Sequence, residues 1–100
     1  MQEKWYEITK KPFTVANAET FRFFLKNIYP KIPELKGAYI ISLRIHIDFE
    51  DNGKIVMYKV ISGKRIYYIT NDLENPQIVR VVNKKPKEEF YNVRKKHKSG

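Results

Sequence analysis

Apolar and polar residues alternate along residues 42–60, which is the pattern of a strand with one buried face. The residues that would share the buried side are Leu43, Ile45, Ile47 and Phe49. The Asn52-Gly53 pair inside this stretch supplies two residues that tolerate positive φ, as a type I′ hairpin requires. The stretch therefore predicts two antiparallel strands joined by a two-residue turn.

This turn also predicts a register between the two strands. It pairs Asp51 with Lys54, and counting back from there sets the remaining pairs. The apolar pairs on the buried side are then Phe49 with Val56, Ile47 with Tyr58, and Ile45 with Val60. Turn chemistry and apolar pattern agree on the buried face, so we expect a well-defined register.

Further strands are expected at residues 4–10, 66–70 and 78–82, which are rich in aromatic and β-branched residues. The chain turns at Ser62-Gly63 between the second strand of the hairpin and residues 66–70. A two-residue turn there places Tyr67 and Ile69 on the core side, and a three-residue turn would exchange the two faces.

A helix is expected after Asn17, which is a good N-cap, with Glu19 in the first turn and Pro30 at the end. The apolar stripe of this helix consists of Phe21, Phe24, Leu25 and Ile28. Residues 31–37 form a connector with room for one extra turn. Together these elements predict an α+β fold with a β-α-β-β-β-β order, an antiparallel meander of four to five strands, and one helix on one face.

We place the core domain at residues 1–83 and a basic segment at residues 84–100. This segment holds seven Lys or Arg against two Glu, a net charge of +5 in seventeen residues. Acidic residues come early in it and basic residues late, which suits the dipole of a short helix docked through Phe90. A solvated, disordered tail is the alternative.

The predicted outer face of the sheet, opposite the helix, is mixed in character. Its members in the predicted hairpin are Arg44, His46, Asp48, Met57, Lys59 and Ile61, with Lys59 opposite His46. Ile40, Ile55, Ile66 and Tyr68 extend it. Contiguous apolar surface of this kind is usually covered, and the candidate covers are the C-terminal segment, a second copy of the chain, or a ligand.

Charge indicates the class of partner. The chain of 100 residues carries 20 Lys and Arg against 11 Asp and Glu, a net charge of +9, which attracts polyanions. Nucleic acid, DNA or RNA, is the commonest such partner. We therefore expect non-catalytic, weakly sequence-specific and largely electrostatic nucleic-acid binding.

Two groups of residues are expected to carry this binding. Phosphate contacts are expected from Lys64, Arg65, Lys84, Lys85, Lys87, Arg94, Lys95, Lys96 and Lys98. Lys59 is also expected among the nucleic-acid-binding residues. Base contacts are expected from Arg44 and Tyr68, because an outward aromatic ring next to cations suits stacking by single strands. Tyr67 is expected in the core, since neighbours on a strand face opposite ways.

Several other functions are disfavoured. There is no cysteine, no metal-ligand spacing, no phosphate-cradling glycine loop and no apolar run that spans a membrane, so we expect no cofactor, no metal and no membrane partner. The simplest location is the cytoplasm. An enzyme is not expected, although His46, Arg44 and Lys59 would suit a small ribonuclease.

The main alternative is a small interaction protein, such as a viral or plasmid-encoded one. It would form a homodimer or bind an acidic or host protein, through the mixed outer face or through an edge strand. A salt-tolerant complex would distinguish it from a nucleic-acid-binding protein.

Overall fold

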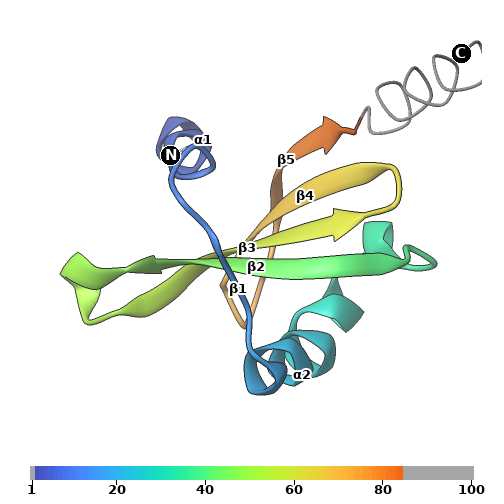
Figure 1. Ribbon diagram of the computed structural model, residues 1–100, viewed down its shortest axis with the longest axis horizontal. Helices are drawn as coiled ribbons and strands as arrows, with labels where there is room; N and C mark the ends of the chain where they lie inside the picture. The colour runs from blue at the N-terminus through green and yellow to red at the C-terminus, as the bar shows by residue number, and fades with distance from the viewer. Residues whose placement is uncertain (1, 85–100) are drawn as a thin grey trace, which may run out of the picture.

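The computed structural model describes the backbone of residues 2–84 and the side chains of residues 5–84 (Figure 1). Its main elements are α1 (Gln2–Ile8), β1 (Thr14–Val15), α2 (Ala18–Asn27), β2 (Ile40–Asp48), β3 (Lys54–Ser62), β4 (Arg65–Thr70) and β5 (Ile78–Asn83). The strands form one antiparallel sheet in the order β1-β2-β3-β4-β5. The predicted α+β fold and the meander are confirmed. None of the helices in this part of the chain has the length and apolar character needed to cross a bilayer.

The expected strand at residues 4–10 is wrong, because this segment forms most of helix α1. Trp5 and Ile8 are three residues apart and both half-buried, whereas Tyr6 and Glu7 are exposed, which is a helical pattern. The first strand is instead β1, which pairs Thr14 with Ile45 and Val15 with Arg44. The order β-α-β-β-β-β therefore holds from β1 onward, with a different and shorter first strand and with the unpredicted helix α1 before it.

Helix α2 begins where the sequence predicts. The Asn17 side chain accepts a hydrogen bond from the backbone N–H of Thr20 at 2.8 Å, which satisfies one of the unpaired donors of the first turn. Phe24 and Ile28 are fully buried, but Leu25 is 42% exposed, so its place in the stripe is wrong. The helix buries only the narrow face that carries Phe24 and Ile28, and Leu25 lies at its margin.

Replacing Asn17 with alanine should lower the free energy of unfolding by about 1 kcal/mol, because the Thr20 N–H loses its acceptor. Asn17→Asp keeps an acceptor oxygen and is the matched control, with an expected change of a few tenths of a kcal/mol at most. Urea unfolding followed by circular dichroism measures both. Equal stability of the alanine variant and the wild type would contradict the capping role.

The turn between β2 and β3 is longer than predicted. Residues 49–53 form it, with a 3-10 turn at Phe49–Asp51 followed by Asn52 and Gly53 in left-handed conformations (φ 60° and 68°). The two residues do supply positive φ, but the two-residue turn is wrong, because the Asp48 side chain caps the extra turn by accepting from Glu50 N–H at 3.0 Å. Phe49, expected in the core, is 81% exposed.

The longer turn changes the register between β2 and β3. Tyr58 lies opposite Ile45 instead of Ile47, and Val60 lies opposite Leu43 instead of Ile45. Both shifts equal two residues, so these side chains keep their faces. Lys59 accordingly lies opposite Arg44, and the expected pair of Lys59 with His46 is wrong.

Two irregularities in the pairing do change faces. The register shifts between Ile40 and Ser42 and again between His46 and Ile47, where Ile47 pairs with Ile55. Ile40 and Ile55, both expected on the outer face, therefore pack against the core. The expected pair of Phe49 with Val56 is wrong for the same reason.

The turn between β3 and β4 has two residues, Gly63 and Lys64, and lies one position later than the predicted Ser62-Gly63. The Ser62 hydroxyl closes it by accepting from Arg65 N–H at 3.1 Å and donating to Arg65 O at 2.9 Å. Tyr67 and Ile69 therefore lie on the core side and are buried, as predicted for a two-residue turn. Strand β5 matches the predicted residues 78–82 to within one residue.

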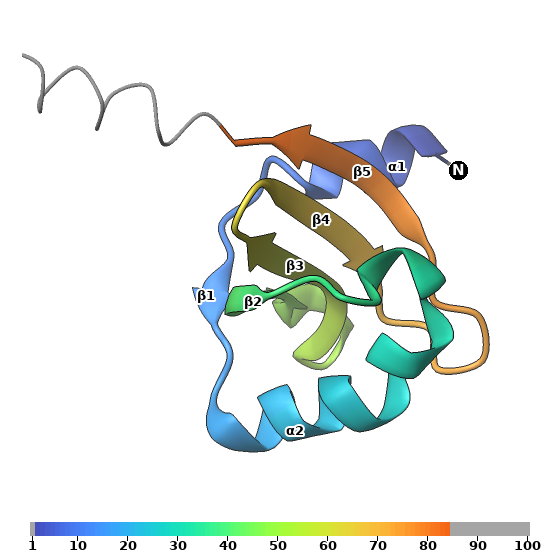
Figure 2. The same cartoon turned by 90° about the vertical axis from the view of Figure 1, so that its right-hand side faces the viewer.

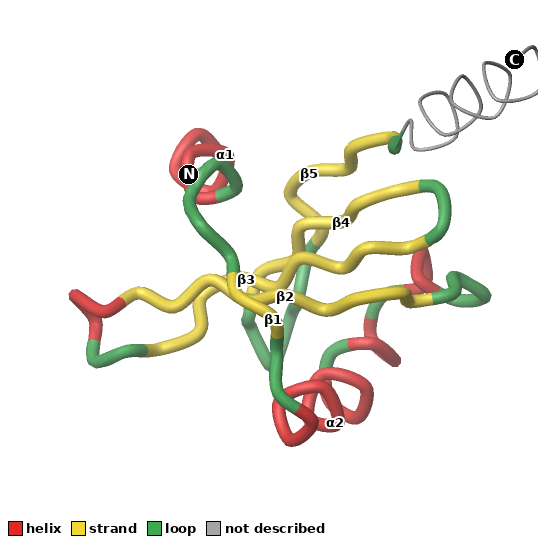
Figure 3. The backbone as a smooth tube through the Cα atoms, viewed as in Figure 1, coloured by secondary structure: helices red, strands yellow, loops and turns green. Residues whose placement is uncertain are grey.

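The core lies between α2 and one face of the sheet (Figures 1 and 2). It consists of Phe24, Ile28, Ile32, Leu35, Leu43, Ile45, Tyr58, Val60, Tyr67 and Ile69. Helix α1 lies on the opposite side of the sheet, beside β5, in both views. The loop between α1 and β1 then crosses the sheet (Figure 3). The outer face is therefore covered by the N-terminal segment, which was not among the expected covers.

Candidate nucleic-acid interface

Three of the predicted cations meet at the β3–β4 end of the sheet. Lys64 is in the turn, Arg65 begins β4, and Lys84 follows β5. The Lys84 N–H donates to Lys64 O at 3.0 Å, and the Lys84 ammonium donates to Ser62 O at 3.1 Å. Lys64 and Arg65 are exposed. This end of the sheet therefore presents a cluster of positive charge to solvent.

A hollow of about 360 Å³ lies beside this cluster, and we call it the hairpin hollow. Its lining residues are Gly37, Ala38, Tyr39, Ser62, Gly63, Lys64, Arg65 and Tyr67. One wall comes from the β3–β4 turn and the other from the loop that leads into β2. The hollow combines two cations with two aromatic side chains.

Tyr39 is the exposed ring of the hairpin hollow. It is 79% exposed, whereas Tyr67 is buried as part of the core. Its position follows from the preceding loop, where Ala38 N–H donates to Leu35 O at 2.9 Å and Gly37 takes a positive φ of 83°. This φ is unfavourable for a residue with a Cβ, so glycine is needed there to turn the chain into β2.

Sequence reasoning missed Tyr39. The available signal was an aromatic residue directly after a Gly-containing connector and before an apolar strand. Such a residue faces solvent or core depending on where the strand begins to pair, and the first pair between β2 and β3 is Ile40 with Ser62. The tertiary pairing therefore decided its exposure.

Arg44, Lys59, Tyr68 and Arg80 form one row across the outer face. Arg44 is opposite Lys59, Lys59 is opposite Tyr68, and Tyr68 is opposite Arg80. The structure thus brings three of the predicted residues together and adds Arg80. We call these four residues the outer row.

The expectation that Tyr68 is an open stacking ring is wrong, because it is only 6% exposed. Phe13 lies against it edge-on, with ring centroids 5.7 Å apart. The Lys59 ammonium is 5.7 Å from the Phe13 ring and 5.6 Å from the Tyr68 ring. The outer row is therefore occupied by the chain's own N-terminal segment.

His46 also contacts this segment. Its Nδ1 donates to Pro12 O at 3.0 Å, and its ring centroid is 5.5 Å from that of Phe13. Met57 is its partner across the strands, and Arg44 is the next residue on the same face. Arg44 Nε is buried without a hydrogen-bond partner. His46, Arg44 and Lys59 share one face, but His46 is engaged in packing.

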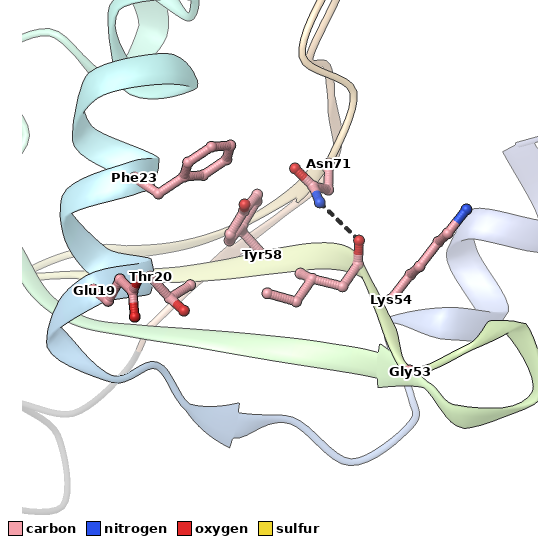
Figure 4. Close-up of a pocket in the computed structure, with 8 residues that line it drawn as sticks. Glu19, Thr20, Phe23, Gly53, Lys54, Tyr58 and Asn71 are labelled. Carbon is pink, nitrogen blue, oxygen red and sulfur yellow. Dashed lines mark hydrogen bonds between the residues drawn. The ribbon is translucent and has the colours of Figure 1, made fainter.

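A second hollow, of about 530 Å³, lies at the other end of β3, between α2 and the β2–β3 turn (Figure 4). Asn71 Nδ2 donates to Ile55 O at 2.7 Å on one side of it. Burial raises the pKa of the Tyr58 hydroxyl to about 12, so this group stays protonated at neutral pH. One lysine, Lys54, and one glutamate, Glu19, line the hollow, so its charges oppose each other. It suits a polyanion less well than the hairpin hollow.

The comparisons with known proteins find no matching family model, no matching curated protein and no matching solved structure. The geometry of the site therefore carries the functional argument.

The remaining predicted cations lie outside the described residues. They are Lys85, Lys87, Arg94, Lys95, Lys96 and Lys98. The chain reaches them from Lys84, which lies beside Lys64 at the hairpin hollow. Among the side chains of residues 5–84, no group of three or more His, Asp or Glu is arranged to hold a metal ion.

Proposed function

We propose that this protein binds single-stranded nucleic acid at the hairpin hollow. The observation that carries the proposal is the 79% exposed ring of Tyr39 in the same hollow as the cations Lys64 and Arg65. Single strands are bound by this combination, because bases stack on exposed rings while cations follow the phosphates.

Each part has a distinct role in this proposal. A base stacks on Tyr39, which every base can do because every base has a π face. Lys64 and Arg65 contact the flanking phosphates, and Lys84 adds charge from β5. The cations beyond Lys84 extend the phosphate contacts, and DNA and RNA both fit this scheme. Binding by stacking and charge is weakly specific for sequence.

Self-association through the outer face was expected because that face would expose apolar surface. In the structure Phe13 lies edge-on against Tyr68 and α1 lies beside β5, so this surface is covered. Self-association through an edge strand stays a proposal. Nucleic-acid binding has the more specific support in the hairpin hollow.

Tyr39→Ala should weaken binding of a labelled single-stranded oligonucleotide by about tenfold at low salt, because a stacked base is worth about 1–3 kcal/mol. Tyr39→Phe keeps the ring and is the matched control, with an expected affinity close to that of the wild type. Fluorescence anisotropy measures both. The proposal fails if the wild type shows no binding at low salt, or if the alanine variant binds as well as the phenylalanine variant.

A further inference from the structure

The outer row is a cation and ring array that resembles the hairpin hollow in chemistry but is covered. Its four residues are three cations and one ring, with Tyr68 between Lys59 and Arg80. All four project from the face opposite α2. Neighbouring strands are about 4.8 Å apart, so the row spans roughly 14 Å. An exposed array of this composition would bind a single strand by stacking and charge.

Residues 5–13 lie over the outer row, and we call them the cover. They make contacts of the kind that a nucleobase would make. The Arg80 guanidinium is 4.6 Å from the Tyr6 ring and 5.8 Å from the Tyr68 ring. Phe13 lies against Tyr68 and within cation–π distance of Lys59. Single-strand sites also use cations over rings, although Phe13 meets Tyr68 edge-on instead of stacking on it. Tyr6 and Phe13 therefore occupy positions on the row that bases could take.

The cover contacts Lys59 and Arg80 through aromatic rings and one hydroxyl group. Arg80 Nη1 donates to Thr9 Oγ1 at 2.9 Å, and the other contacts of Lys59 and Arg80 given above are with rings. A cation–π contact does not neutralise the charge of the cation. A phosphate would pair with that charge directly. A nucleic acid therefore forms an ion pair with the row that the cover does not form.

The cover can leave the row without opening the core. The core cluster contains no residue of the segment 5–13, because it lies on the other face of the sheet. Helix α1 has seven residues, and a helix of this length is not stable without docking. Residues 5–13 contact the sheet through separate interactions of Tyr6, Thr9, Pro12 and Phe13, which are individually weak. Trp5 and Ile8 of α1 are only half-buried.

We propose that residues 5–13 are a displaceable cover, and that single-stranded nucleic acid replaces them on the outer row. This inference rests on the proposed function, because it names a second surface for the same ligand. Arg65 and Tyr68 are three residues apart along β4 and face opposite sides of the sheet, so a strand held at the hairpin hollow would reach the row by passing around this end of the sheet.

The test uses Phe13→Ala in the full chain. The variant removes the ring that covers Tyr68 and Lys59 and leaves the row intact, so affinity for a single-stranded oligonucleotide should rise about fivefold. Phe49→Ala is the matched control, because Phe49 is an exposed phenylalanine at the far turn, and its affinity should equal that of the wild type. Adding Lys59→Ala to Phe13→Ala should remove the gain.

A second readout reports the cover itself. Trp5 is the only tryptophan of the chain and lies half-buried in α1. Saturating oligonucleotide should shift its emission to longer wavelength and increase its quenching by acrylamide. Unchanged emission together with unchanged affinity of Phe13→Ala would overturn the cover proposal while leaving binding at Tyr39 intact. Failure of the wild type and of Phe13→Ala to bind would overturn both proposals.

Thr9→Val is a second test that serves if Phe13→Ala does not fold. Valine is similar in shape to threonine but lacks the hydroxyl that accepts from Arg80. The cover should loosen and the affinity should rise again. A normal thermal unfolding profile with unchanged affinity in this variant would also overturn the proposal.

Discussion

Phe24→Ala should lower the free energy of unfolding by about 3–5 kcal/mol, the largest stability effect that we expect of any single substitution in this protein. Phe24 is fully buried at the centre of the interface between α2 and the sheet. Its ring centroid is 5.0 Å from that of Tyr58, which is itself buried. Alanine removes this packing and leaves a cavity, because the rigid strands β2 and β3 cannot collapse into it.

The neighbouring Phe23 is the matched control. It lies on the same helix but is 40% exposed, so Phe23→Ala makes the same chemical change with much less lost burial. Its expected cost is about 1 kcal/mol or less. Urea unfolding followed by circular dichroism gives both values. Phe24→Leu, at about 1–1.5 kcal/mol, serves if the alanine variant does not fold. Equal costs at the two positions would show that α2 does not pack through Phe24.

Affinity for a single-stranded oligonucleotide should fall by at least ~20-fold between about 50 mM and about 200 mM salt. Each phosphate contact on a single strand contributes about −0.7 to the slope of log affinity against log salt. Lys64, Arg65 and Lys84 make three such contacts in our proposal, which gives a slope of about −2. Cations beyond Lys84 would make the slope steeper.

The variant with both Lys64→Ala and Arg65→Ala tests which cations produce this slope. Losing two contacts should reduce its magnitude by about 1.4. Arg22→Ala with Lys26→Ala is the matched control, because it removes one arginine and one lysine from the exposed side of α2. Its slope should equal that of the wild type. Equal slopes for the two double variants would mean that net charge alone, and not the hairpin hollow, attracts the nucleic acid.

The sequence predicted the elements that depend on local chemistry. Asn17 caps α2 because its side chain reaches an N–H only three residues away. The meander follows from alternating patterns separated by short turns, and such strands pair with their neighbours. The predicted face was correct for the middle of the hairpin even though its register was not, because a shift of two residues preserves which side a residue faces. It was wrong for Ile40 and Ile55, which lie at irregularities in the pairing.

The wrong predictions concern segments where two local patterns compete. The stretch KWYEITK reads as an alternating strand, yet Trp5 and Ile8 also share one side of a helix. The segment forms a helix because it docks beside β5, where Arg80 contacts Tyr6 and Thr9. Similarly, Asn52-Gly53 fits a two-residue turn, but the Asp48 side chain stabilises a longer one. The pattern of apolar positions along the chain does not predict these contacts.

By itself the sequence determined the fold class, most of the core-facing residues of the central strands and the positive charge. These depend on periodicity and composition, which are properties of neighbours along the chain. Only the tertiary structure decided that Tyr39 is open while Tyr68 is covered, and that Arg44, Lys59, Tyr68 and Arg80 stand in one row. Exposure and alignment depend on strand register and on what packs over a face, and both are set by contacts between residues far apart in sequence.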